Sequence, residues 1–203
     1  PKIRTEPAKD VQGLHVFVTV DEGESYELGK VSIDGSAPPI QPDALLKAGD
    51  FKTGEIANME RFNEGVEKVR RTVRRAGYMD AKVTSERKID DEKKVVNVTV
   101  TVEPGPQYTM GKLTLVGLDL EGDAEMKRIF AMKEGKPFNP EYPDNFLKRV
   151  KEEGMFDNLG ELKSEVHLNA ANHSADVTLK FGGADPQNGK PGRRGRGRGG
   201  AWI

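Results

Sequence analysis

Tyr26-Glu-Leu-Gly-Lys-Val-Ser-Ile-Asp-Gly35 is matched, 82 residues further along the chain, by Tyr108-Thr-Met-Gly-Lys-Leu-Thr-Leu-Val-Gly117. The two stretches share the tyrosine, both glycines, the lysine and the apolar character of the positions between them. Agreement of this kind at one fixed offset indicates an internal repeat.

The repeat extends upstream at the same offset. Five positions agree there: Leu14, Val16, Val18, Val20 and Gly23 match Val96, Val98, Val100, Val102 and Gly105. In both copies apolar residues alternate with others, which is typical of a strand with one buried face. A strand, a turn and a second strand therefore recur in register.

Each copy is predicted to open with a short strand, at Lys30–Ile33 and at Lys112–Leu115, and a glycine ends each run. In the first copy a small helix follows, with Pro42 in its first turn and Gly49 at its end. A longer helix comes next, because apolar residues recur at steps of three and four, at Met59, Phe62, Val66, Val69 and Val73. We expect this apolar stripe to lie on a sheet.

Gly77-Tyr78 is typical of the end of a helix. The sequence then predicts a charged strand over Ala81–Lys88, a turn at Asp90-Asp91-Glu92 and a strongly alternating strand over Val95–Val102. The unit is therefore β-α-α-β-β, and the chain is expected to be an α+β protein of tandem repeats.

The second copy follows the same order. Asn139 is predicted as the N-cap of its longer helix and Pro140 as the first residue of that helix. The glycines that flank this helix lie closer together than in the first copy, so we expect it to be about one turn shorter. Two strands are predicted near Leu162–Leu168 and Ala175–Phe181.

These patterns divide the chain into four parts. Residues 1–23 are expected to be the closing hairpin of an earlier copy, so that the sequence begins inside a repeat. Residues 24–104 and 105–183 are expected to be complete copies. Residues 184–203 are rich in glycine and arginine and have no apolar periodicity, so we predict a disordered tail; its arginines are Arg193, Arg194, Arg196 and Arg198.

The composition indicates a globular protein without a dominant charge. The chain has 203 residues, 35% of them hydrophobic, which is enough for one or two compact domains. Its formal net charge is -1, so no global field selects nucleic acid or an anionic membrane. We find neither a long apolar run nor an export leader, although a leader can be removed on maturation. The lack of cysteine excludes disulfides and a cysteine nucleophile.

A β-α-α-β-β unit that opens with Tyr-x-[Leu/Met]-Gly-Lys-[Val/Leu]-x-[Ile/Leu]-x-Gly, with Gly77-Tyr78-Met79-Asp80-Ala81-Lys82-Val83 after its long helix, resembles the POTRA (polypeptide-transport-associated) domain. The resemblance covers about residues 1–181. The second copy reads Gly154-Met155-Phe156-Asp157 where Gly-Tyr is expected, which leaves the position and length of its middle strand open. POTRA arrays precede the barrel in the Omp85 superfamily, which inserts outer-membrane proteins, and in two-partner secretion pores.

The resemblance implies a three-stranded mixed sheet, with two helices on one face and the middle strand in sequence at one edge. It also implies a bacterial periplasmic address. Only about twenty residues follow Phe181, too few for the eight or more strands of a transmembrane barrel. We expect either a barrel that has been separated from this sequence or a barrel-free POTRA protein, and the arginine-glycine ending favours the second.

An uncovered edge strand can accept a foreign strand through backbone hydrogen bonds. For the first copy we predict that such an edge is formed by Ala81, Lys82, Val83, Thr84, Ser85, Glu86, Arg87 and Lys88. The charges on this strand are better explained as protection against edge-to-edge aggregation, which is compatible with weak client capture. A second candidate is a basic helix face, expected to be a solvated surface or, alternatively, a contact with a partner or anionic lipid: Arg70, Arg71, Arg74 and Arg75.

Other candidate residues favour structural roles. Tyr26 and Tyr108 open equivalent strands and are expected to pack, not to bind a ligand. The three histidines, His15, His167 and His173, form no ligand pair on a helix, so we predict no metal site. No nucleophile, base and orienting residue can be grouped, so we predict no enzyme and no cofactor. Arginine-glycine segments can bind single-stranded nucleic acid, but contact with an anionic envelope surface is the favoured role of the tail.

The sequence therefore predicts a periplasmic protein-interaction module in outer-membrane protein assembly or export. It would bind outer-membrane protein precursors, or a β-barrel assembly or secretion component, by edge-strand augmentation. Association with the outer membrane would be peripheral, through a partner, and no nucleic acid is expected. The alternative is a structural spacer or docking subunit beside an outer-membrane barrel that binds no unfolded client.

Overall fold

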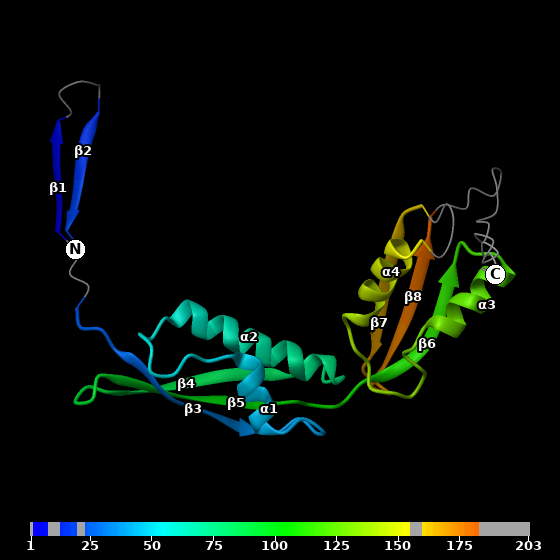
Figure 1. Ribbon diagram of the computed structural model, residues 1–203, viewed down its shortest axis with the longest axis horizontal. Helices are drawn as coiled ribbons and strands as arrows, with labels where there is room; N and C mark the ends of the chain where they lie inside the picture. The colour runs from blue at the N-terminus through cyan, green and yellow to red at the C-terminus, as the bar shows by residue number, and fades with distance from the viewer. Residues whose placement is uncertain (1, 8–12, 20–22, 155–159, 183–203) are drawn as a thin grey trace, which may run out of the picture.

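The structure is a computed structural model that describes residues 2–7, 13–19, 23–154 and 160–182. Two units of the same topology follow one another, and a separate antiparallel hairpin precedes them (Figure 1). The hairpin consists of β1 (Lys2–Pro7) and β2 (Leu14–Thr19). The first unit comprises β3 (Glu27–Gly35), α1 (Pro42–Gly49), α2 (Met59–Arg75), β4 (Lys82–Asp90) and β5 (Val95–Glu103). The second comprises β6 (Thr109–Val116), α3 (Leu120–Ile129), α4 (Tyr142–Glu152), β7 (Leu162–Asn169) and β8 (Ser174–Phe181).

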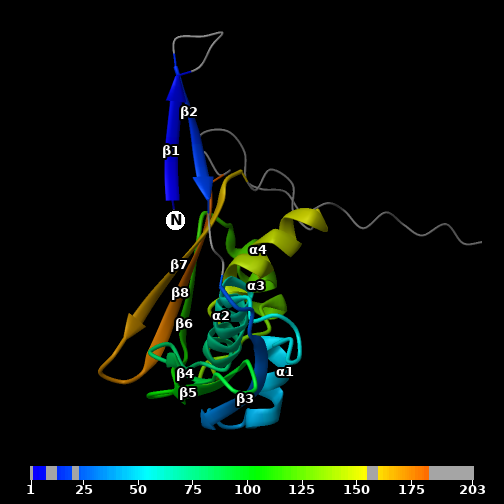
Figure 2. The same ribbon diagram turned by 90° about the vertical axis from the view of Figure 1, so that its left-hand side faces the viewer.

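Each unit is built on a three-stranded mixed sheet. The strand order is β3-β5-β4 in the first unit and β6-β8-β7 in the second. The outer strands β3 and β6 run parallel to the central strand, whereas β4 and β7 run antiparallel to it. Figure 2 shows α1 and α2 on one side of the first sheet. The predicted β-α-α-β-β order, the mixed sheet and the edge position of the middle strand are confirmed.

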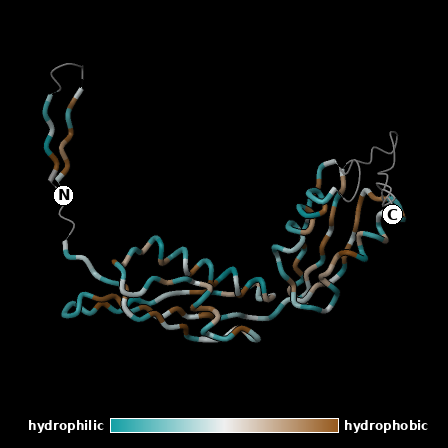
Figure 3. Tube along the Cα trace, viewed as in Figure 1, coloured by the Kyte–Doolittle hydropathy of each residue, from teal (hydrophilic) through white to brown (hydrophobic). Residues whose placement is uncertain are grey.

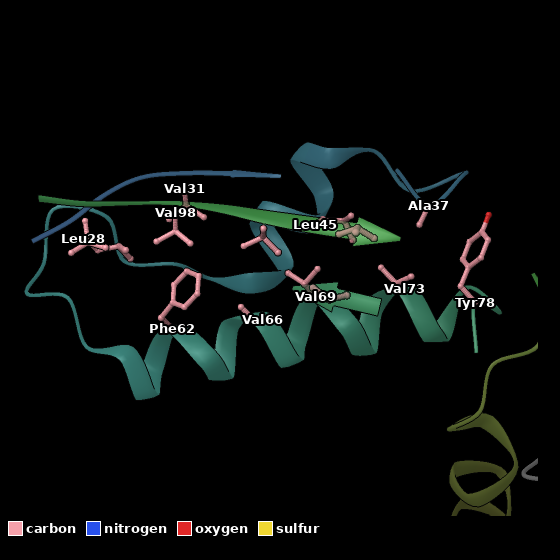
Figure 4. Close-up of a cluster of buried hydrophobic side chains, with 14 residues drawn as sticks. Leu28, Val31, Ala37, Leu45, Phe62, Val66, Val69, Val73, Tyr78 and Val98 are labelled. Carbon is pink, nitrogen blue, oxygen red and sulfur yellow. The ribbon is translucent and has the colours of Figure 1, made fainter. Parts of the chain in front are cut away.

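The core of the first unit lies between the central strand and the long helix. Alternate residues of β5 are buried: Val96, Val98, Val100 and Val102. The predicted stripe of α2 faces them, and Leu45 of α1 packs into the same cluster (Figure 4). The second unit has its own core, in which β8 packs against Phe146, Leu147 and Val150 of α4. Each unit therefore has a hydrophobic core of its own.

A β-bulge lengthens the opening strands beyond the prediction. In β3 the register shifts between Leu28 and Val31, so that two buried residues are separated by two others. The sequence prediction began the strand at Lys30, which is too late, because the bulge interrupts the alternation. The side chain of Asn97 accepts a hydrogen bond of 2.8 Å from the backbone N–H of Lys30. A Cβ at Gly29 would lie 2.5 Å from the Asn97 Oδ1, which explains the glycine.

The same device recurs in the second unit. The side chain of Asp176 accepts a hydrogen bond of 2.7 Å from the backbone N–H of Lys112. A Cβ at Gly111 would lie 2.2 Å from the Asp176 Oδ1. The Gly-Lys pair of the repeated motif is therefore a bulge whose backbone is held by a side chain of the central strand.

Several predicted boundaries of the first unit need correction. The helix α1 ends at Gly49 as predicted, but the residue in the left-handed conformation is Asp50, with φ 51°. The strand β4 begins at Lys82 and continues to Asp90, so Ala81 lies outside it. The turn comprises residues 91–94 and ends with Lys94 at φ 53°. The charged side chains obscured the end of this strand, because little apolar alternation marks it.

In the second unit the predicted helix start is wrong. The N-cap of α4 is Glu141, and Asn139 and Pro140 precede the helix. The Asn139 side chain accepts a hydrogen bond of 3.0 Å from the backbone N–H of Glu141, so it holds the turn before the helix. With 11 residues against 17 in α2, α4 is shorter by more than the one turn predicted.

The hairpin exposes an apolar face. Ile3 pairs with Val18, and the side chains of Leu14, Val16 and Val18 are all more than half exposed. Figure 3 shows this hydrophobic stretch along the hairpin. Among the described residues, no helix combines the length and apolar character needed to cross a membrane. The predicted disorder of residues 184–203 lies outside the described residues.

Candidate protein-interaction site

The edge strand β4 carries the residues that the sequence predicts for partner binding. Seven of the eight predicted residues, Lys82 to Lys88, lie in this strand, and Ala81 precedes it. Val83 is buried beneath α2, whereas Ile89 near the other end of the strand is 60% exposed. The long helix therefore covers only the first part of β4 and leaves the rest open.

The register of the sheet shows which backbone groups of β4 face outward. Neighbouring residues of an antiparallel strand direct their backbone groups alternately toward and away from the paired strand. The guanidinium of Arg70 donates a hydrogen bond of 3.1 Å to the carbonyl of Val83. The register partner of Val83 is Val102, whose carbonyl faces Gly35 of β3 on the other side. Val83 therefore directs its backbone groups away from β5.

The alternation extends this assignment along the strand. The backbone groups of Ser85, Arg87 and Ile89 face outward like those of Val83, whereas the backbone groups of Thr84, Glu86 and Lys88 bond to β5. Because Arg70 occupies the Val83 carbonyl, the open part of the edge begins at Ser85. The side chains of Thr84, Glu86 and Lys88 are exposed on the sheet face opposite the buried Val83.

A second edge strand, β7, lies at the equivalent place in the second unit. Its residues Val166 and Leu168 are 40% and 39% exposed, and they face the same side as the core of β8. Partner-binding edge residues are predicted from the sequence only for the first copy, so this strand is not among them. The strand predicted near Leu162–Leu168 nevertheless agrees with the bounds of β7, which pairs with β8 as β4 pairs with β5.

The four arginines of α2 have different surroundings. Arg70 pairs with Glu67 and with the Val83 carbonyl. Arg75 donates two hydrogen bonds to the Glu141 carboxylate, one of 2.8 Å from Nε and one of 2.5 Å from Nη2. Arg71 lies 3.5 Å from the other oxygen of Glu141. Half of the predicted basic face therefore contacts the second unit, a contact that helical periodicity cannot reveal.

The two units meet at a bonded junction. The backbone N–H of Tyr108 donates a hydrogen bond of 2.7 Å to the carbonyl of Gly77. The side-chain amide of Gln107 donates one of 2.7 Å to the carbonyl of Ala76. Gly77 has φ +98°, and a Cβ there would lie 2.6 Å from the Tyr108 carbonyl oxygen. Met79 of the first unit also packs against the second core.

The motif tyrosines donate hydrogen bonds to carboxylates. Tyr26 donates one of 2.6 Å to Asp91, and Tyr108 one of 3.0 Å to Asp80. Each bond, more than burial, raises the pKa of its phenol above the usual value of 10.0. The ring of His173 meets Tyr108 edge-on at 5.5 Å. These contacts match the predicted packing role of both tyrosines.

The histidines are not gathered. His15 lies in β2, His167 in β7 and His173 just before β8. Within the described ranges, no group of three or more potential metal ligands comes together.

Residues 26–105 match the POTRA family, described as surface antigen variable number repeat. The chain is 24% identical over 157 residues to the outer membrane protein assembly factor BamA of Neisseria meningitidis serogroup B, a match that covers 77% of this chain and 19% of the relative. It is 23% identical over 131 residues to BamA of Buchnera aphidicola subsp. Acyrthosiphon pisum, covering 64% of this chain and 21% of the relative. The chain spans only about a fifth of the length of these curated relatives.

The fold is similar to that of a solved array. The crystal structure of Haemophilus influenzae BamA POTRA3-5 matches with a TM-score of 0.57 and 21% identity, covering 89% of this chain and 70% of that chain. The second unit has the same strand order and the same bulge as the first. Residues 26–105 therefore match the POTRA family, and the second unit repeats the topology of this segment.

Proposed function

We propose that this chain is a protein-interaction module of the bacterial periplasm that takes part in the assembly or export of outer-membrane proteins. It binds precursor segments or a partner subunit by accepting a strand along β4. The observation that carries this proposal is the open edge from Ser85 to Ile89, where backbone donors and acceptors face outward beyond the Arg70 contact. Two relatives that match the chain are named outer membrane protein assembly factor BamA.

Strand addition suits a binder of many clients. Main-chain hydrogen bonds supply most of the recognition, and they are formed by any extended segment. The charged side chains Glu86 and Lys88 flank this edge and limit uncontrolled pairing between copies of the protein. Weak, reversible capture is the expected result.

A second candidate function is a rigid spacer or docking subunit, and the junction between the units favours it. Arg75, Glu141 and the Gly77 backbone join the two units directly. A spacer needs this fixed geometry and needs no open edge. The two functions therefore differ in whether β4 touches client chains.

Ser85→Pro tests strand addition. This substitution removes an outward N–H and leaves the bonds to β5 in place, so the domain should fold. Thr84→Pro is the comparison, because it removes an N–H that pairs with β5 and should lower stability instead. A photo-crosslinking residue at Lys88, in the full-length protein in its native envelope, should capture outer-membrane precursors, and Ser85→Pro should abolish the capture.

Two results would contradict the proposal. Capture at Lys88 that persists in a folded Ser85→Pro variant would exclude strand addition at this edge. Capture of one folded barrel from an exposed helix position such as Glu64, with nothing captured at Lys88, would establish the spacer or docking function instead.

A further inference from the structure

A hollow of about 280 Å³ lies where α2 meets the residues that lead into α4. Its lining is charged and comes from both repeats: Glu67, Arg70, Arg71, Arg74, Pro140 and Glu141. The hollow lies between two units. It is therefore more accessible to a protruding polypeptide chain than to a flat surface such as a layer of lipid headgroups.

The carboxylates of the hollow are already engaged. Glu67 pairs with Arg70 at 2.6 Å, and Glu141 is held by Arg75 and Arg71. The guanidinium of Arg74 is exposed and has no ion-pair or hydrogen-bond partner among the residues that the structure describes. The hollow therefore presents one guanidinium that is free to bind a ligand. The group that complements a guanidinium best is a carboxylate.

One side chain connects the hollow with the β4 edge. Arg70 lines the hollow and also donates its hydrogen bond to the Val83 carbonyl. The open edge begins just beyond this contact, at Ser85. A strand paired along that edge and continuing past Val83 arrives at the hollow.

We propose that the hollow makes β4 selective for strands with an acidic residue at one position. This residue directly follows the segment paired with β4, at the end of the segment near Val83. The carboxylate of that residue binds Arg74, beside Arg70. This inference rests on the proposed function, since it names the kind of segment that the same edge accepts. The favoured partner is thus an extended polypeptide with an acidic flank.

The chain itself supplies a suitable probe. The β5 sequence Val95–Glu103 already pairs antiparallel with β4, and its Glu103 lies opposite Lys82. A labelled, C-terminally amidated peptide of this sequence, bound antiparallel on the outer edge, places its glutamate at the Val83 end. A second peptide with glutamine in place of that glutamate removes only the charge. Both are titrated against the whole 203-residue chain by fluorescence anisotropy.

The glutamate peptide should bind about two- to fivefold more tightly than the glutamine peptide, the effect expected of an exposed ion pair. Arg74→Gln should make the two affinities equal, and about 0.5 M salt should do the same, because screening shortens the reach of the charge. Lys47→Gln removes an equal charge from α1, outside the hollow, and should leave the discrimination intact.

The outcomes separate the two proposals. If Ser85→Pro weakens both peptides but the unchanged protein does not discriminate between them, the hollow is not selective and strand addition stands. If discrimination survives Arg74→Gln and disappears in Lys82→Gln, selectivity belongs to the edge strand and the inference is overturned. If neither peptide binds, both proposals fail.

Discussion

The phenolic hydroxyl of Tyr108 donates a hydrogen bond of 3.0 Å to a carboxylate oxygen of Asp80, which lies 28 residues earlier, in the preceding repeat. The equivalent tyrosine, Tyr26, donates instead to Asp91 of its own repeat. The same motif residue thus holds a turn in one copy and a junction in the other. This difference allows the junction to be perturbed selectively.

Alkaline pH should weaken the Tyr108 contact. The hydrogen bond to Asp80 raises the pKa of this phenol above 10.0, so the folded state holds the proton more tightly than the unfolded state. Its stabilisation is complete below about pH 10 and is lost as pH rises through the raised pKa. Urea unfolding midpoints measured across this range should fall less steeply in Tyr108→Phe than in the unchanged protein.

Tyr26→Phe provides the matched control, because its partner Asp91 lies in the same repeat. It should also flatten the alkaline decline without changing the distance between the units. Equal pH profiles for Tyr108→Phe and the unchanged protein would show that the Asp80 bond does not form in solution.

Glu141→Gln should loosen the junction while barely changing stability. The side chains of Arg75 and Glu141 are 50% and 33% exposed, so the pair contributes no more than about 1 kcal/mol to folding. The chain has no cysteine, so spin labels on Thr99→Cys and His167→Cys report one distance between the units. We expect a broader distance distribution in Glu141→Gln, and similar broadening of the unchanged protein at high salt.

Glu152→Gln is the control for this measurement, since Glu152 pairs with Lys148 within α4. It removes an equal charge without touching the junction. A distribution that stays narrow in Glu141→Gln would show that the backbone bond between Gly77 and Tyr108 suffices to fix the two units.

The bulge of β3 predicts a compensating pair of substitutions. Gly29→Ala places a Cβ 2.5 Å from the Asn97 Oδ1 and should destabilise the protein. Asn97→Ala leaves the Lys30 N–H without its partner, at a cost of about 1 kcal/mol. The double variant removes the clash, so its loss of unfolding free energy should be smaller than the sum of the two single losses.

Asn97→Asp should be tolerated, because aspartate performs the same task at Asp176 in the second unit. Urea denaturation of the unchanged protein, the two single variants and the double variant completes the cycle, and Asn97→Asp is measured beside them. If the losses of the two single variants simply add in the double variant, the Asn97 side chain moves aside freely. It is then not the reason why position 29 is a glycine.

The sequence predicts what depends on local periodicity and on the repeat. The α2 stripe and the alternation of β5 are local patterns, and they locate the core of the first unit correctly. The β3 bulge was missed because Leu28 and Val31 break the period of two, although the equivalent residues Asn97 and Asp176 offered a signal.

Contacts between units could not be predicted in this way. Arg75 and Glu141 are 66 residues apart, and they meet only because of the angle at the Gly77 junction. No periodicity encodes that angle. Most of the β4 edge was predicted, whereas the Arg70 contact that limits it follows only from the packing of α2 on the sheet.

The hairpin of β1 and β2 supports a last prediction, based on the proposal that it closes a repeat of the same kind. Val16 and Val18 are 58% and 56% exposed, whereas Val98 and Val100, 82 positions later, are 2% and 0% exposed. In the first unit β3, α1 and α2 bury those positions. The hairpin should therefore accept the same cover.

Fusing a copy of residues 26–82 in front of Pro1 supplies that cover at the spacing of the repeat. If the proposal is correct, backbone amides of β2 should become protected in hydrogen exchange, because burial of Val16 and Val18 stabilises the pairing of β1 with β2. A fusion with Val69→Asp in the added copy should fail to protect them, since Val69 is fully buried in α2 and a charge there prevents packing. Protection that is equal in the two fusions, or absent from both, would show that the hairpin is not the closing half of a repeat, and that its apolar face is covered by something of another kind.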